Sequence, residues 1–323
     1  LRGLVGSEMC IRDRHYDPDK DPGAEAGITC LTCHAMTAVG SPRGNGDYVL
    51  SDPPRYPFAF SESPLLQAVN RQLIKAKPAF HKQTLLKPLH HSPEFCSVCH
   101  KVHLPEELNR YRWLRGQNHY DSFLLSGVSG HRVDSFYYPP RAKATCGECH
   151  MPAARSDDPA ARALDASASP AVHHHGFAAA NTAVPHMLGH PAEANQERLA
   201  MLRTAARVDI FGLKDGGTIE GRLHAPLRPQ LPALEPGKRY LLELVVRTTG
   251  MGHQLTQGTV DSNELWLDLT LTDGERIIGR SGGLDAERDS DPWSYFLNAY
   301  LLDREGNRIE RRNVQDLSLI HIS

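Results

Sequence analysis

The sequence contains the string Cys30-Leu31-Thr32-Cys33-His34, and the same Cys-x-x-Cys-His pattern recurs at residues 96–100 and 146–150. On a helical turn, residues three and four positions apart lie on one face, so the two thiols and the imidazole of each motif point the same way. This spacing is typical of covalent haem attachment, in which two thiols bond to one porphyrin and the histidine binds its iron. The motifs therefore predict at least three haems of the c type.

A structural zinc site is the main alternative for paired cysteines. Such sites combine two Cys-x-x-Cys modules to complete a tetrahedron of four ligands. This chain has three modules and would leave one unmatched. Histidine accounts for only 18 of the 323 residues, yet one follows each of the three pairs directly. The pattern therefore favours haem over zinc.

Both ends of the chain resemble a translated sequencing adapter. Residues 9–13 can be encoded by a DNA string whose reverse complement reads through the codons of residues 318–322. We set residues 1–14 and 317–323 aside as adapter-derived segments, and we expect the natural protein to be longer at both ends. Cys10 lies in the first of these segments, so the six other cysteines all belong to the motifs.

Cysteine use and charge limit the compartment and the partners. Because no cysteine remains for a disulfide or for nucleophilic catalysis, the chain suits an oxidising space, and we expect a periplasmic or extracellular location. The 36 basic and 38 acidic residues nearly balance, which argues against nucleic acid as a partner. No stretch of about 18 apolar residues predicts a membrane span.

The composition changes along the chain and predicts an α+β protein. Residues 15–152 are rich in histidine, proline and polar turns. We expect a mostly helical and irregular multihaem domain there, packed around haems that supply the missing apolar mass. Ser63-Pro64 predicts a helix over residues 65–75, Pro105 predicts another over residues 106–114, and the motifs are expected on short helical turns.

The second half is expected to be rich in strands. Residues 153–195, rich in alanine, serine and proline, are interpreted as a linker that wraps the haem domain. Residues 196–316 are predicted to open with a helix over residues 197–208 and to continue with six or seven short strands, as in an antiparallel β-sandwich. The alternation over residues 240–247 predicts one strand. Turn residues at 215–217, 272–275 and 303–307 predict hairpins.

The sixth iron ligand separates electron carriers from catalysts. Histidines outside the motifs are numerous enough to supply it. Methionine is the alternative sixth ligand. Met36 and Met151 follow their own motif histidines so closely, however, that the chain can hardly bring their side chains to the opposite side of the same iron. We therefore expect bis-histidine ligation, which gives lower reduction potentials than a methionine ligand would.

The haem half resembles multihaem cytochromes of the cytochrome c554 and hydroxylamine-oxidoreductase-like group. The strings that carry the resemblance lie at residues 27–34, 93–100 and 146–152, and the resemblance covers residues 24–190. It implies a distal histidine shortly before a motif, which points to His90 or His91. It also implies a distal histidine in a His-x-Phe string, and His175 occupies that position in this chain. We name His119 as the third candidate distal ligand.

The downstream strands resemble β-domains appended to multihaem proteins. In those domains a Gly-His string in a loop can approach a haem, and Gly252-His253 matches this pattern. The resemblance implies His253 as a further candidate ligand. The three residues Thr256-Gln257-Gly258 depart from the Pro-Thr-Gly that usually follows.

The candidate site residues fall into three groups. The thioether cysteines are Cys30, Cys33, Cys96, Cys99, Cys146 and Cys149, the proximal histidines are His34, His100 and His150, and the candidate distal histidines are His90, His91, His119, His175 and His253.

The expected function is electron transfer through at least three haems c, with redox proteins or a quinol-linked donor as partners. Two alternatives stay open. One haem without a distal ligand would make the protein an enzyme that acts on a small inorganic nitrogen or sulfur compound. In the other, the haems are structural or sensory and the β-sandwich is the binding part.

Overall fold

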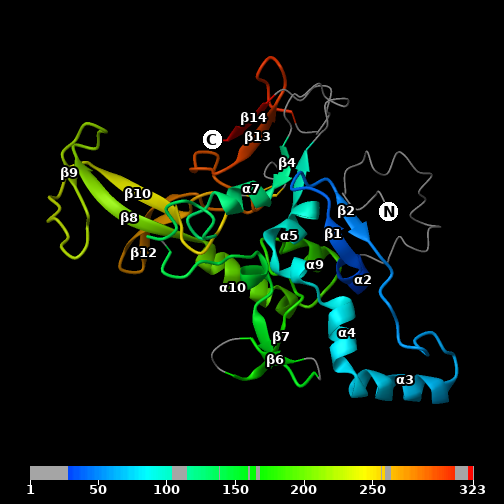
Figure 1. Cartoon of the computed structure of the whole chain (residues 1–323). Coiled ribbons are helices and arrows are strands. Elements are labelled where there is room, and N and C mark those ends of the chain that lie inside the picture. The colour runs from blue at the N-terminus through cyan, green and yellow to red at the C-terminus, as the bar shows by residue number, and fades with distance from the viewer. Residues whose placement is uncertain are drawn as a thin grey trace.

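The structure is a computed structural model that describes residues 28–103, 115–137, 139–158, 161–164, 168–255, 257–258, 263–309 and 319–322. Short helices and small antiparallel sheets share the chain, as expected for an α+β protein. In Figure 1 helix α5 (Pro93–His100), which carries the second motif, lies near the centre of the molecule, and α2 (Cys30–His34), which carries the first, lies to its right. Strands β8 (Ala206–Asp215), β9 (Leu223–His224) and β10 (Tyr240–Thr248) extend to one side, and helix α3 (Pro64–Ala76) extends to another.

The three motifs lie on short helices, as predicted. These helices are α2 (Cys30–His34), α5 (Pro93–His100) and α8 (Gly147–His150), with Cys146 as the N-cap of α8. The start of α5 has a clear local cause, because the hydroxyl of Ser92 accepts the N–H of Phe95 and Pro93 occupies the first turn.

The other elements of the haem half connect these motif helices. The helix predicted after Ser63 is present as α3, whereas the one predicted over residues 106–114 lies outside the described residues. Strands β1 and β2 pair, as do β3 and β4. The bounds are β1 (Met36–Val39), β2 (Tyr48–Leu50), α3 (Pro64–Ala76), α4 (Pro78–Leu85), η1 (Pro88–His91), β3 (Lys101–His103), β4 (Arg115–Asn118) and α7 (His119–Leu124).

The segment interpreted as a linker has secondary structure of its own. Strands β5 (Ala153–Arg155), β6 (Arg162–Ala163) and β7 (Pro170–His173) form a three-stranded sheet with β7 in the middle. Helix α9 (Ala183–Met187) and the 3₁₀ turn η2 (Ala192–Asn195) follow. Strands this short show no detectable alternation of apolar and polar residues, so the sequence pattern did not reveal them.

The β half opens with helix α10 (Gln196–Ala205), which ends three residues before the predicted Val208. The chain becomes extended at Ala206 and continues as β8 (Ala206–Asp215), because its residues pair along β10 (Tyr240–Thr248). Strand β9 (Leu223–His224) pairs with the other edge of β8. The strand predicted over residues 240–247 is therefore confirmed, and the predicted hairpin around residues 215–217 is present.

Two smaller sheets complete the β half. Strands β11 (Leu269–Asp273) and β12 (Arg276–Ser281) form the predicted hairpin. Strand β13 (Ala299–Leu302) is followed by the predicted turn, closed by an antiparallel bridge between Leu302 and Arg308. It also pairs with β14 (Leu319–Ile322), which lies in the segment attributed to an adapter and carries no functional argument. The β-sandwich packing of these sheets remains a prediction.

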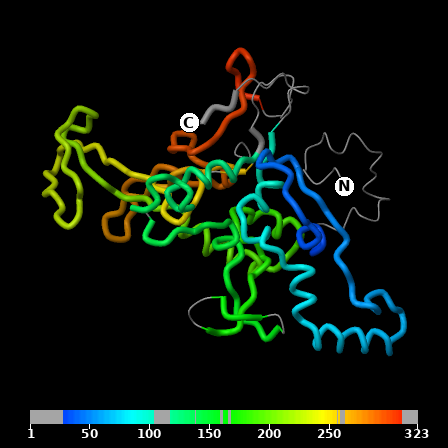
Figure 2. The backbone as a smooth tube through the Cα atoms, in the orientation of Figure 1, coloured from blue at the N-terminus to red at the C-terminus, as the bar shows by residue number. Residues whose placement is uncertain are grey.

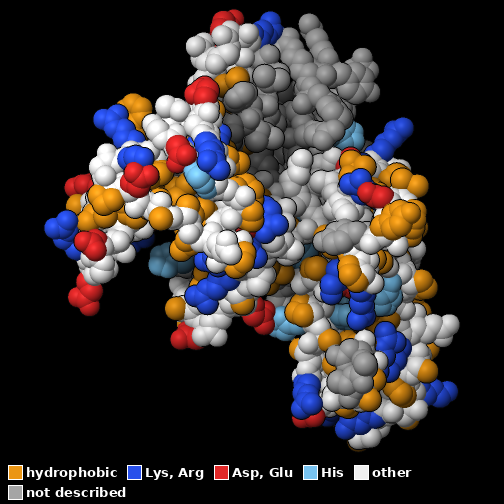
Figure 3. All heavy atoms as spheres, turned by 90° about the vertical axis from the view of Figure 1, so that its left-hand side faces the viewer, with side chains coloured by type: hydrophobic (Ala, Val, Ile, Leu, Met, Phe, Trp, Pro, Cys, Tyr) orange, Lys and Arg blue, Asp and Glu red, His pale blue; other side chains and the backbone are white. Residues whose placement is uncertain are grey.

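The polypeptide by itself forms only a small apolar core. Eleven apolar residues of the described part are buried, and five of them are alanines. Large apolar side chains are exposed throughout, including Trp293 at 90% and Phe60 at 76%. Figure 3 shows such hydrophobic side chains lying among charged ones over the visible face. Of the large buried side chains, Val98 lies within the second motif and Met36 lies two residues after the first. Tyr120 and Phe123 lie on α7, where the hydroxyl of Tyr120 donates to Glu94 of α5 at 2.7 Å.

Candidate haem-binding site

The fold brings the cysteines of different motifs together. The thiols of Cys96 and Cys146, from α5 and α8, lie close enough to interact with each other. This contact and burial both raise the pKa of Cys96. Burial and the nearby Cys33 thiol raise the pKa of Cys99, so the first motif is close to the second. All six motif cysteines are unpaired, and their thiols are therefore available for thioether bonds.

A first group of imidazoles, which we call histidine cluster 1, forms around the proximal His34. Its ring centroid lies 5.0 Å from that of His90 and 6.2 Å from that of His175. The Nδ1 of His34 donates to the carbonyl oxygen of Leu85, the last residue of α4, at 2.9 Å. The Nζ of Lys87 donates to the carbonyl of His34 itself at 2.5 Å. Residues 85–87 therefore hold α2 from two sides.

A second group, histidine cluster 2, contains both remaining proximal histidines. The ring of His100 lies 5.2 Å from that of His119, and the His119 ring lies 5.6 Å from that of His253. His253 in turn stacks on His150, with centroids 6.3 Å apart and planes inclined by 7°. Two proximal and two candidate distal histidines thus share one region.

The hydrogen bonds of these rings leave Nε2 free at several positions. A carbonyl oxygen only accepts, so an Nδ1 within hydrogen-bond distance of one carries the proton, and Nε2 keeps its lone pair. The Nδ1 of His150 lies 2.8 Å from the carbonyl oxygen of Ala178. Backbone carbonyls also accept from the Nδ1 of His119, His175 and His253. This arrangement is typical of metal-ligating histidines, whose second nitrogen donates to a backbone carbonyl or carboxylate.

Burial favours the neutral form of three imidazoles in cluster 2, those of His100, His119 and His253, and the neutral form is the one that binds a metal. Burial lowers the pKa of His119 to about 4, with help from the neighbouring His100 and His253. Burial is also the first cause of the lowered pKa of His100 and His253. These three rings of cluster 2 therefore favour the uncharged form at neutral pH.

The predicted distal histidines do not all occupy equivalent positions. Three of them lie beside motif histidines and bond to a backbone carbonyl through Nδ1, so that their own Nε2 is not used in that bond. These are His119, His175 and His253. His90 lies beside His34, but its Nδ1 accepts the N–H of Lys87 and its Nε2 donates to the carbonyl of Cys33, both at 3.2 Å. The ring nearest to His91 is that of His173, at 6.5 Å.

One further histidine, His173, was not singled out from the sequence. Its Nδ1 donates to the carbonyl of Met151 at 2.8 Å, directly after the third motif. The run of three histidines at residues 173–175 is the sequence feature that could have indicated it. The spacing of the motifs does not tell which of these three side chains faces the third motif.

The residues present fit covalently bound haem. Each motif brings two unpaired thiols and an imidazole to one short helix, and the thin apolar core leaves apolar surface for a flat cofactor to cover. Across the described ranges, no three His, Cys, Asp or Glu side chains form a group that could hold a metal ion alone. Nor is any described helix long and apolar enough to cross a membrane.

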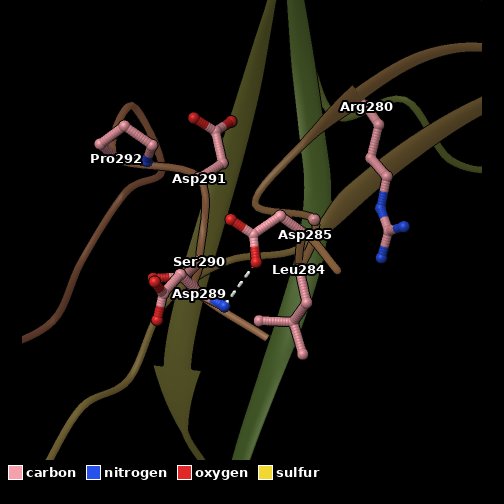
Figure 4. A pocket seen from close by; sticks show the side chains of 8 residues that line it. Arg280, Leu284, Asp285, Asp289, Ser290, Asp291 and Pro292 are labelled. Carbon is pink, nitrogen blue, oxygen red and sulfur yellow. Dashed lines mark hydrogen bonds between the residues drawn. The ribbon is translucent and has the colours of Figure 1, made fainter. Parts of the chain in front are cut away.

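A shallow depression in the β half is separate from these clusters. It has a volume of about 370 Å³ and is lined mainly by the loop after β12 (Figure 4). There Asp285 accepts the N–H of Asp289 at 2.8 Å. The guanidinium of Arg280, which also lines it, is bound at 2.6 and 3.1 Å by Asp268. The lining contains no cysteine or histidine, so it adds nothing to the haem site.

Comparisons with known proteins add no relative to this picture. No protein-family model matches the chain, and searches of curated proteins and of solved structures found no similar protein.

Proposed function

We propose that this protein is a multihaem c-type cytochrome that relays electrons through at least three covalently bound haems with bis-histidine ligation. The observation that carries the proposal is the convergence of the three motifs and their candidate distal histidines in two adjoining clusters. Motif spacing alone requires no such convergence. Each haem, when bound, supplies a one-electron iron couple.

The arrangement of ligands supports a carrier with closed iron sites. Each proximal histidine has a candidate partner close by: His175 for His34, His119 for His100, and His253 for His150. These partners come from elements far apart in the chain, so the fold, rather than local sequence, assembles each pair. The neutral state of His119 and His253 suits iron ligation at physiological pH.

The contact between thiols supports short distances between cofactors. Cys96 and Cys146 belong to different motifs and touch. Haems bonded to two such cysteines would be held next to each other, and a relay of single electrons needs that closeness. The polypeptide then holds the cofactors in place and tunes their potentials through ligands, hydrogen bonds and burial.

The proposal extends to the rest of the chain. The haems would fill the space that the polypeptide core leaves open, and the strands of residues 196–316 would pack as a β-sandwich that serves as a docking module. We further propose a periplasmic or extracellular location, with a redox protein or a quinol-linked donor as partner.

The test is an electron paramagnetic resonance spectrum of the oxidised, haem-loaded protein, with iron quantified against protein. Three low-spin irons per chain are expected, because every site would be closed by two imidazoles. A high-spin fraction of about one third would show one open iron and favour the enzyme alternative. Absence of haem iron would overturn the proposal altogether.

A further inference from the structure

The loop that carries His253 is fastened to the helix that carries His119. The side-chain amide of Gln257 donates to the carbonyl oxygen of Asn118 at 3.1 Å and to the hydroxyl of Ser122 at 2.6 Å. These bonds join residues 139 and 135 positions apart in the chain. Figure 2 shows the same proximity, with the loop after β10 lying beside the segment that forms α7.

Gln257 binds the first turn of α7, the part of the helix that orients His119. The side chain of Asn118 caps this turn by accepting the N–H of Asp121 at 3.1 Å. The hydroxyl of Ser122 is 3.1 Å from the carbonyl of Asn118 and 3.2 Å from that of His119. One amide therefore contacts two groups that are already bonded into the turn that begins with His119.

Two glycines allow the loop to lie flat against α7. A Cβ on Gly252 would lie 3.0 Å from Cδ2 of Phe123. Gly258 has a φ of +87°, which favours glycine, and a Cβ there would lie 3.6 Å from the His119 ring. The loop thus contacts α7 on both sides of His253, and the imidazoles of His253 and His119 face each other at 5.6 Å.

We infer that Gln257 is a positioning residue that sets His253 of the β half against His119 of the haem half, so that two neighbouring irons receive their distal ligands together. The inference rests on the proposed function and adds a residue and a coupling between the two halves. It also explains the departure from Pro-Thr-Gly at residues 256–258. The longer amide side chain reaches α7, where a threonine would be too short to contact both Asn118 and Ser122.

The inference is tested with the haem-loaded full chain carrying Gln257→Ala. We expect three haems per chain to be retained, with up to one third of the iron converted from low-spin to high-spin because His253 loses its fixed position. Added imidazole should return that fraction to low-spin by supplying the missing nitrogen. His253→Ala is the positive control and should give the same spectrum and the same rescue.

The matched control is Gln254→Ala, in the same loop. Its side chain is exposed, and only its backbone carbonyl bonds to His253, so the spectrum should remain that of the wild type. A Gln257→Ala protein that is less stable to heat but spectroscopically unchanged would overturn the inference and leave the proposed function intact. A wild-type protein without haem iron would instead refute the proposed function.

Discussion

At the scale of single residues, backbone carbonyls orient the imidazoles. The carbonyl of Leu85 receives the Nδ1 proton of His34 from 51 positions away, and that of Ala178 receives the proton of His150 from 28 positions away. A carbonyl has no side-chain signature, so no sequence motif indicates these partners. The three proximal histidines were identified from the motif, but the groups that hold their rings were not.

The cysteine pairs give the most direct test at this scale. Replacing both Cys146 and Cys149 by serine is expected to lower the iron content from three to two per chain, because serine cannot form the thioether bonds. Iron analysis and intact mass would measure the loss. Met151→Leu, directly after the motif, should retain all three haems. Three covalently bound haems in the doubly substituted protein would contradict our assignment of the third motif.

At the scale of elements, turn chemistry was a better guide than periodicity. Residues 272–275 and 303–307 gave turns where they were predicted, because glycine and short polar residues favour tight reversals. Strands β3, β5, β6 and β7 were not predicted. They are two to four residues long, and their pairing depends on which distant segment lies alongside.

The turn between β11 and β12 depends on Gly274, which has a φ of +59°. Gly274→Ala is expected to lower the free energy of unfolding by about 1 kcal/mol, since an L side chain is strained in this region. Gly279→Ala, in β12, is the control, because its Cβ would meet only an ordinary contact at 3.8 Å. Denaturant unfolding of both variants would show the difference, and equal stability would disprove the role assigned to this turn.

The turn after β13 has a predicted pH dependence. Hydrogen bonds from the side chain and backbone of Asn307 lower the pKa of Asp303. A carboxyl whose pKa is depressed on folding stabilises the protein above its unfolded value, near 3.8, and loses this effect as the pH falls through the folded value.

We therefore expect Asp303→Ala to lower the melting temperature at pH 7, and to differ less from the wild type at pH 2, because the stabilisation by the carboxylate is lost as the pH falls below the unfolded pKa. Thermal melts at the two pH values would measure this. If the difference in melting temperature between variant and wild type is the same at both pH values, the charge of Asp303 does not stabilise the fold.

At the scale of the whole molecule, the small apolar core and the proposed haems together predict that stability depends on the cofactors. Only Val98, Ser97 and Ser129 among the described residues have side chains with almost no exposed surface. A ligand that binds only the folded state stabilises it. We therefore expect the haem-free protein to be digested by protease faster, and to unfold over a broader temperature range, than the haem-loaded protein. Equal protection in both forms would show that the polypeptide packs adequately without haem.

Short-range spacing correctly predicted the helical turns that carry the motifs and the main hairpins, because each depends on residues a few positions apart. The same spacing is the basis for proposing the attachment cysteines and the proximal histidines. The pairing of His253 with His150, the contact between Cys96 and Cys146 and the bonds of Gln257 to α7 emerged only from the tertiary structure. Those contacts join distant segments through backbone groups and unremarkable side chains. They follow from how the chain packs, and no local pattern encodes them.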